Sequence, residues 1–253
     1  MKSKAAGGRR RRQNSNSLES RAALMRAAER CVAEHGLAGA PLTVIHKAAG
    51  QKNASAVNYH FGSRNGLISQ ILEERMPGLD ADRMSRLEAI RTKPPDLPPL
   101  RDIVAVWVYP LANELRPRAE GNYYLRFLDR LRHDESENFA AEIVALQRGY
   151  QTIFSLVSEH LAQLPPVLRA SRIALAAEQV ISGLARLEAE LQGREGSDGN
   201  FPTLAIENLI DYIAGGLAAP ASATSLASAE DAAPVDFHLH FYGGDPGGSR
   251  TAI

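Results

Sequence analysis

Apolar residues recur at intervals of three and four along most of the chain, the spacing that places them on one face of an α-helix. The first such helix is expected to start near Leu18, to carry Leu24, Ala28 and Cys31 on one face, and to end at Gly36. The pattern predicts an all-α protein.

Two short helices around a tight turn are predicted next. Thr43 is expected to cap the first, which ends at Gly50, and the second covers about residues 54–60. Ser63 then caps a longer helix, with a kink or break expected at Pro77. Helices of this size and order are typical of a helix-turn-helix domain, whose later helix enters the major groove of DNA.

The remainder of the chain predicts a larger helical region and a tail. After a proline-rich corner, helices are expected at about residues 100–115, 122–133 and 138–164. Two helices with apolar stripes follow, one after Pro165-Pro166 and one at about 203–217. Beyond residue 218 the composition is that of a flexible tail, in which residues 235–242 alternate apolar and polar side chains like a short strand.

The formal net charge is zero, but the charges are unevenly distributed. Residues 1–76 contain 13 Lys and Arg against five Asp and Glu, and the remainder contains 16 against 24. Residues 1–17, which include Arg9–Arg12, have the composition of a disordered basic arm. The front of the chain is therefore expected to meet a polyanion such as nucleic acid, the alternative being a solvated tail.

Several classes of protein are disfavoured. The chain has one cysteine, Cys31, so no intramolecular disulfide can form and a cytoplasmic location is expected. We find no apolar run of the roughly 18 residues that span a bilayer. We also find no phosphate-binding glycine loop, no Cys/His cluster with metal-ligand spacing and no nucleophile elbow, so neither an enzyme nor a cofactor or metal is expected. His238 and His240, with Asp236, offer metal ligands in the tail, a pairing that is more often incidental.

The segment Ala49–Leu67, AGQKNASAVNYHFGSRNGL, resembles the DNA-binding domain of the tetracycline-repressor-like (TetR/AcrR) family of bacterial regulators. Further shared features lie upstream, at Ala27-Ala28, Glu34-His35-Gly36 and Thr43. The resemblance covers about residues 18–72. It departs from the family in one extra residue between Gly50 and Tyr59, and in His46, where a small alanine is usual, so a slightly longer turn is expected.

The resemblance implies a three-helix DNA-binding domain at residues 18–75 and a larger helical domain at residues 76–217, followed by the tail, 218–253. In the short recognition helix, Asn58 is expected to read adenine through a bidentate contact, whereas Val57 and Phe61 are core. The other polar and basic residues of the set are expected to contact phosphates or, in the arm, the minor groove. The predicted DNA-binding set is Thr43, Lys52, Ser55, Ala56, Asn58, Tyr59, His60, Arg64 and the arm residues Arg9, Arg10, Arg11 and Arg12.

The same resemblance implies a homodimer and a small-molecule effector of unknown identity. The expected dimer interface is formed by Ile173, Val180, Leu184, Leu187, Leu191, Ile206, Ile210 and Ile213, which in the alternative are the core of a monomer. The expected effector pocket is formed by Trp107, Tyr109, Tyr123, Tyr124, Phe127 and Phe154, with Arg130 and His133 as polar anchors; the alternative for each is plain core or surface. The chain is thus predicted to be a repressor released from a palindromic double-stranded DNA operator by its effector. The alternative is a helical sensor or protein-interaction module without sequence-specific DNA binding.

Overall fold

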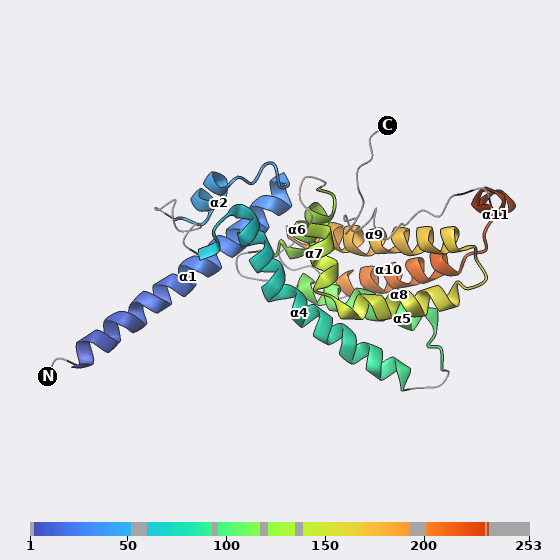
Figure 1. Cartoon of the computed structure of the whole chain (residues 1–253), viewed down its shortest axis with the longest axis horizontal. Helices are drawn as coiled ribbons and strands as arrows, with labels where there is room; N and C mark the ends of the chain where they lie inside the picture. Colours follow the sequence, from blue (N-terminus) through green and yellow to red (C-terminus); the bar gives the residue numbers. More distant parts are fainter. Residues whose placement is uncertain are drawn as a thin grey trace, which may run out of the picture.

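The computed structural model describes residues 3–51, 60–92, 96–116, 121–134, 139–192, 201–230 and 232, with the backbone alone for residues 3–16. All regular structure in these ranges is helical, as the apolar periodicity predicted (Figure 1). The helices are α1 (Ser3–His35), α2 (Leu42–Ala48), α4 (Arg64–Arg91), α5 (Leu100–Ala112), the 3₁₀ turn η1 (Asn113–Leu115), α6 (Tyr124–Arg132), α7 (Phe139–Ala145), α8 (Arg148–His160), α9 (Pro166–Leu191), α10 (Phe201–Ala218) and α11 (Ala223–Glu230). Among the described helices, none combines the length and the hydrophobicity needed to cross a membrane.

We call the C-terminal half of α1, α2 and the start of α4 the head. Its core is apolar and almost completely excluded from solvent. Gly36 and Gly50 follow α1 and α2 with φ of +70° and +65°, a conformation that favours glycine and ends each helix where the sequence predicted. The main core residues are Leu24, Ala28, Cys31, Val32, Ile45, Leu67, Ile68 and Ile71.

The starts of the first two helices differ from the prediction. Helix α1 begins at Ser3 instead of Leu18, so the backbone of the predicted arm from Ser3 on is helical. Four Arg, two Ala, one Lys and one Gln in residues 3–17 favour helix, and the stretch has no proline. Helix α2 begins at Leu42 with Pro41 as its N-cap residue, so Thr43 lies inside the helix and does not cap it.

Helix α4 connects the head to the rest of the molecule. Its N-cap is Ser63, as predicted: the Ser63 hydroxyl accepts a hydrogen bond from the Gly66 N–H at 3.0 Å. The helix continues through Pro77, where a kink or break was expected. A proline inside a helix costs about 3 kcal/mol, but α4 packs against α5, α7 and α8 on both sides of this position, and these contacts hold it together.

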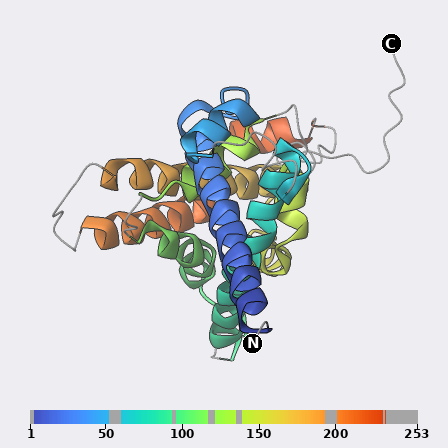
Figure 2. The same cartoon turned by 90° about the vertical axis from the view of Figure 1, so that its left-hand side faces the viewer.

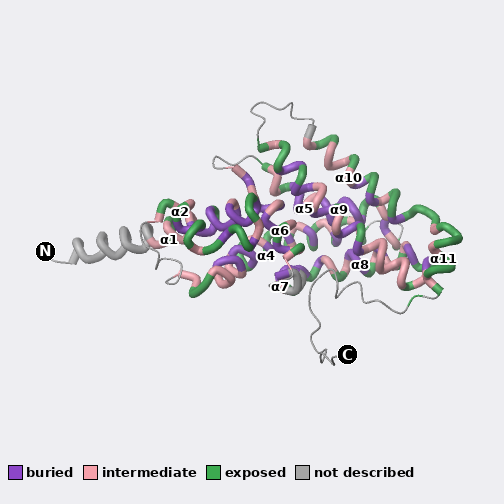
Figure 3. The backbone as a smooth tube through the Cα atoms, turned by 90° about the horizontal axis from the view of Figure 1, so that it is seen from above, coloured by how far each residue is buried: buried purple, intermediate pink, exposed green. Residues whose placement is uncertain are grey.

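We call α5 to α11, with the second half of α4, the body. Helices α5, α8, α9 and α10 run side by side and bury the central core of the molecule (Figure 3). Viewed along the long axis, α9 and α10 form a neighbouring pair, and α1 crosses in front of the body (Figure 2). Trp107 of α5 lies at the centre of this core, with its ring centroid 5.3 Å from that of Phe154 and 5.9 Å from that of Tyr150.

Two further boundaries in the body differ from the prediction. The helix expected at residues 138–164 is two helices, α7 and α8, because Gln147 leaves the helical conformation and its side chain donates to the Ile143 carbonyl at 3.0 Å. The predicted tail contains α11, which packs against α9. The expected strand at residues 235–242 lies outside the described residues, as do His238 and His240.

Candidate nucleic-acid interface and its link to the body

Helix α2 presents one polar edge to solvent. Thr43 and Lys47 are exposed, whereas Ile45 and His46, on the opposite side, are buried in the head. The exposed hydroxyl and ammonium groups are of the kind that contact phosphates. Of the predicted DNA-binding residues, Thr43 is therefore exposed to solvent, and Lys47 is an additional exposed cation that was not predicted from the sequence.

The central part of the predicted DNA-binding set lies outside the described residues. This part consists of Lys52, Ser55, Ala56, Asn58 and Tyr59, together with the predicted core residue Val57. Arg9, Arg10, Arg11 and Arg12 belong to α1, and the structure describes only their backbone. Their roles remain predictions from the sequence.

Arg64 and Phe61 fix the start of α4 in the head. The Arg64 side chain is half-buried and donates from Nη1 to the Leu37 carbonyl at 3.0 Å, so it ties α4 to the loop after α1. Phe61 is half-buried against the core, and the Arg21 guanidinium lies 5.6 Å from the centre of its ring. The sequence assigned Arg64 to a phosphate contact, and the structure gives it a positioning contact. His60 is half-buried beside Phe61, with ring centroids 5.9 Å apart.

Two unusual side chains lie inside the head. His46 is 7% exposed, and its Nε2 has no hydrogen-bond partner among the described residues. Cys31 is also buried in the core of the head, and this burial raises the pKa of its thiol. A thiol with a raised pKa is a poor nucleophile, which is the property of a structural core cysteine.

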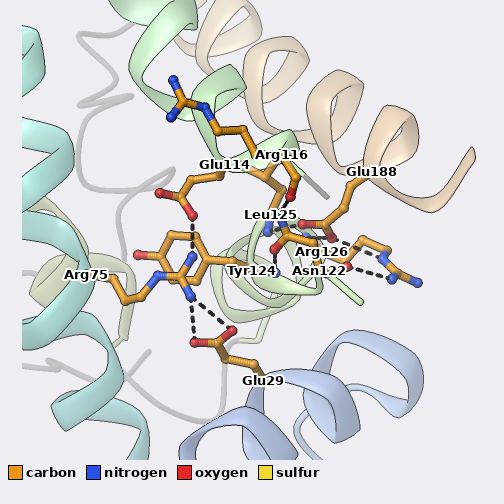
Figure 4. Close-up of polar contacts among 9 residues, drawn as sticks. All are labelled: Glu29, Arg75, Glu114, Arg116, Asn122, Tyr124, Leu125, Arg126 and Glu188. Atoms are coloured by element: carbon orange, nitrogen blue, oxygen red, sulfur yellow. Dashed lines mark hydrogen bonds and ion pairs between the residues drawn. The ribbon is translucent and has the colours of Figure 1, made fainter. Parts of the chain in front are cut away.

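Arg75 of α4 joins the head to the body at one point (Figure 4). Its Nη1 donates to Glu29 of α1 at 3.0 Å, and its Nη2 donates to Glu114 in η1. The guanidinium also lies over the ring of Tyr124 in α6, 3.8 Å from its centroid. Arg75 thus contacts α1, η1 and α6 at once, so a movement of any of these helices relative to α4 must rearrange this group.

Helix α6 is held at its N-terminal end by a residue of α9. Tyr123, the N-cap residue, offers no side-chain cap. Instead, the Glu188 carboxylate accepts from the N–H groups of Leu125 and Arg126 at 2.9 and 3.1 Å, and from Nε of Arg126 at 3.1 Å (Figure 4). Glu188 is 2% exposed. A buried carboxylate at this position satisfies N–H groups that a helix start leaves unpaired and also matches its positive dipole.

The predicted effector pocket is divided among several environments. Trp107, Tyr124, Phe127 and Phe154 are buried core residues, whereas Tyr109 and Tyr123 are half-buried. Arg130 and His133 are exposed, so the polar anchors expected inside the pocket lie on the surface. Both residues fall in the last turn or cap of α6.

A different set of polar groups reaches the interior of the body. A cavity of about 20 Å³ is lined by Arg132, Gln147 and Tyr150 together with apolar side chains. This is room for about one water molecule. Beside it, Arg83 is fully buried and donates from Nη1 to Gln147 at 2.8 Å, while its Nε and Nη2 have no hydrogen-bond partner within the described part of the chain.

Half of the predicted dimer residues belong to the core of a single chain. Val180, Leu184, Ile210 and Ile213 are at most 2% exposed, so a second copy cannot contact them directly. Leu187 is also buried, and Ile173, Leu191 and Ile206 are half-buried. The exposed large apolar side chains of α9 and α10 are Leu175, Leu204 and Tyr212. The residues predicted for the dimer therefore lie mainly on the inward face of α9 and α10, because both faces of these helices carry apolar residues.

An exposed polar group connects α5 to α10. Arg101 donates to Glu207 and Asp211 at 2.7 and 2.6 Å, and the Tyr109 hydroxyl donates to Glu207. The Tyr109 hydroxyl and Arg101 lower the pKa of Glu207, and the same hydrogen bond raises the pKa of Tyr109. The pKa of Arg101 is raised by its two carboxylate partners.

Five charged residues with buried or half-buried contacts were not predicted from the sequence: Glu29, Arg75, Arg83, Glu114 and Glu188. Glu29 and Arg75 are 46 residues apart, and Leu125 and Glu188 are 63 apart, so no local spacing signals these pairs. Charged residues on otherwise apolar helix faces were the one available signal. No family model matches the chain, and no characterised protein matches it.

Proposed function

We propose that the protein is a sequence-specific DNA-binding regulator of transcription. The observation that carries the proposal is the head: a compact apolar core that holds α2, a turn at Gly50 and a Ser63-capped α4, in the most basic part of the chain. The exposed Thr43 and Lys47 of α2 support it, since they leave the polar edge of the head open to phosphates. Asn58 is the proposed base-reading residue.

The regulator acts as a homodimer on a palindromic operator. A short recognition helix contacts few base pairs, so two copies related by a two-fold axis give useful specificity. The proposed dimer surface is the outer side of α9 and α10, where Leu175, Leu204 and Tyr212 are exposed.

A small-molecule effector releases the operator, which makes the protein a repressor. Arg83, Arg132 and Gln147 are the polar groups that reach the interior of the body, so the effector site is placed there. A cavity of about 20 Å³ is too small for such a ligand, so the effector binds a second, more open arrangement of the body. Helix α6, which contacts both α1 and α9, carries the change to the head.

The test is selection of random double-stranded DNA by the full-length protein, followed by fluorescence-anisotropy titration of the enriched sequence at two salt concentrations. Asn58→Ala is expected to lose about 1–3 kcal/mol of discrimination between operator and random DNA. Lys47→Ala is expected to weaken binding to all sequences and to reduce the salt dependence by about one phosphate contact. Arg91→Ala, which removes an exposed cation from the end of α4 far from the head, is the matched control and leaves binding unchanged.

Enrichment of a palindrome, with these two different losses, supports the proposal. If no sequence is enriched, the proposal fails, and the helical sensor or protein-interaction module without sequence-specific DNA binding takes its place. Arg64→Ala is a poor probe of phosphate contact because Arg64 also holds the start of α4.

A further inference from the structure

Three side chains that can bind a metal ion meet on the surface of the body, where α6 ends against the middle of α9. Asp129, His133 and Glu178 each offer one ligand atom, and these atoms lie within 4.8 Å of one another. Nε2 of His133 is 2.8 Å from a carboxylate oxygen of Glu178, and its Nδ1 is 3.9 Å from the Asp129 carboxylate. The His133 side chain is 54% exposed, so an ion can reach it from solvent.

The orientation of the His133 ring is fixed by the backbone. Its Nδ1 lies 2.7 Å from the Asp129 carbonyl oxygen. Because a carbonyl oxygen can only accept a hydrogen bond, Nδ1 carries the hydrogen. In the neutral imidazole, the lone pair of Nε2 then faces the Glu178 carboxylate. A lone pair and a carboxylate oxygen at 2.8 Å repel each other unless a proton or a cation lies on Nε2. A histidine whose Nδ1–H donates to a backbone carbonyl is the common arrangement of a metal ligand that binds through Nε2.

The two carboxylates are held in place by neighbours of their own. The Ser182 hydroxyl lies 2.7 Å from Asp129 and 3.1 Å from Glu178. Arg132 donates from Nη2 to the other oxygen of Glu178 at 3.1 Å, and from Nη1 to the Ala177 carbonyl. One guanidinium against two carboxylates leaves the group with a net negative charge, which favours a divalent cation.

We propose that Asp129, His133 and Glu178 bind one divalent transition-metal ion, with Zn²⁺ as the best match. One imidazole and two carboxylates suit zinc, which takes nitrogen and oxygen ligands and accepts water in a fourth position. Mg²⁺ and Ca²⁺ prefer oxygen ligands in greater number. Zinc bonds of about 2.0–2.2 Å in a tetrahedral arrangement need the 2.8 Å contact between His133 and Glu178 to widen and Asp129 to approach, which side-chain rotation at this exposed site permits. The sequence predicted no metal at these residues, and the site is independent of DNA binding.

The ion fastens the C-terminal end of α6 to α9. Glu188 already holds the N-terminal end of α6 to the same helix. With metal bound, α6 is attached to α9 at both ends. The proposal therefore predicts that the metal raises the melting temperature of the protein and makes the end of α6 more resistant to hydrogen exchange.

The experiment is isothermal titration of the metal-free, full-length protein with ZnCl₂ at pH 7.5. Wild type is expected to bind one Zn²⁺ at this site, and His133→Gln and Glu178→Gln to bind it at least about tenfold more weakly. His35→Gln is the matched control, since His35 is an exposed histidine 3.8 Å from a carboxylate of Glu34, and it leaves the affinity unchanged. Far-UV circular dichroism confirms that each variant is folded.

His238 and His240 are rival ligands in the tail, so the double variant His238→Gln/His240→Gln is titrated as well. The proposal is overturned if wild type binds no Zn²⁺, if His133→Gln binds as wild type does, or if the double tail variant alone removes binding. In the first case His133 is a protonated ion-pair partner of Glu178. Ser182→Ala tests positioning: it is expected to weaken Zn²⁺ about tenfold without changing the visible spectrum of bound Co²⁺, whereas His133→Gln changes that spectrum.

Discussion

The head and the body are held together by different chemistry. The core of the head is built on apolar side chains of α1, α2 and α4, and the buried polar residues of the head are His46 and, where it meets the body, Glu29. The body buries charges deeper inside: Glu188 caps α6 from α9, and Arg83 lies fully inside with Gln147. Buried polar contacts depend on exact geometry, so the body is the region in which a ligand that alters such contacts has the larger effect.

The largest loss of stability is expected from removing Glu188, the buried carboxylate of the body. Glu188→Ala leaves the start of α6 uncapped and Arg126 without its carboxylate, so we expect the free energy of unfolding to fall by about 3–5 kcal/mol. Glu190→Ala, two residues away in an exposed pair with Arg186, is the matched control and should cost about 0.5 kcal/mol or less. Urea unfolding followed by circular dichroism measures both. Equal losses in the two variants would show that the buried cap contributes little.

Local and long-range contacts also differ in how well they could be predicted from the sequence. In the head, the ends of α1 and α2 at Gly36 and Gly50 and the Ser63 cap of α4 were predicted, because glycines and caps are local signals. The starts of α1 and α2 were not. The polar contacts of the body were not predicted either, because Arg75 and Glu188 find their partners across the fold and no spacing along the chain indicates them. For the same reason, the residues predicted for the dimer lie mainly on the inward face of α9 and α10. Arg130 and His133 were predicted to lie inside the body, whereas the arginines found there are Arg83 and Arg132.

A polar atom introduced into the head tests its apolar character. Cys31→Ser replaces a buried thiol by a hydroxyl and should lower the free energy of unfolding by about 2 kcal/mol. Cys31→Ala, which adds no polar atom, should cost less. Because burial raises the pKa of Cys31, its alkylation by iodoacetamide at pH 8 should be slow in the native protein and fast in urea. Rapid alkylation without urea would contradict the burial of this thiol.

A buried cation in the body is expected to contribute less than the Glu188 cap. Arg83→Met keeps an unbranched side chain but removes a guanidinium whose Nη1 lies 3.4 Å from Asp80 and donates to Gln147 at 2.8 Å, while its Nε and Nη2 have no partner among the described residues. Removing one partner of a buried ion pair costs stability, but the two unpartnered nitrogens and the burial of the charge offset part of that cost, so we expect a loss of about 1–2 kcal/mol in urea unfolding. Gln147→Met in the same background tests whether the remaining amide matters. An unchanged or higher free energy of unfolding in Arg83→Met would mean that the cost of burying the guanidinium outweighs its contacts.

The smallest effect is expected at the exposed contact between α5 and α10. The pKa of Glu207 is lowered from its ordinary 4.5 by Tyr109 and Arg101, so its contribution to stability is present above that value and is lost as the pH falls through the lower, folded-state value. Glu207→Gln should remove this part of the acid dependence, seen as a shallower loss of melting temperature between about pH 5 and pH 3. Sodium chloride should reduce the difference, because the group is exposed and therefore screened. Identical acid profiles would mean that the contact does not hold α5 to α10 in solution, and the connection between these helices would then rest on their apolar faces alone.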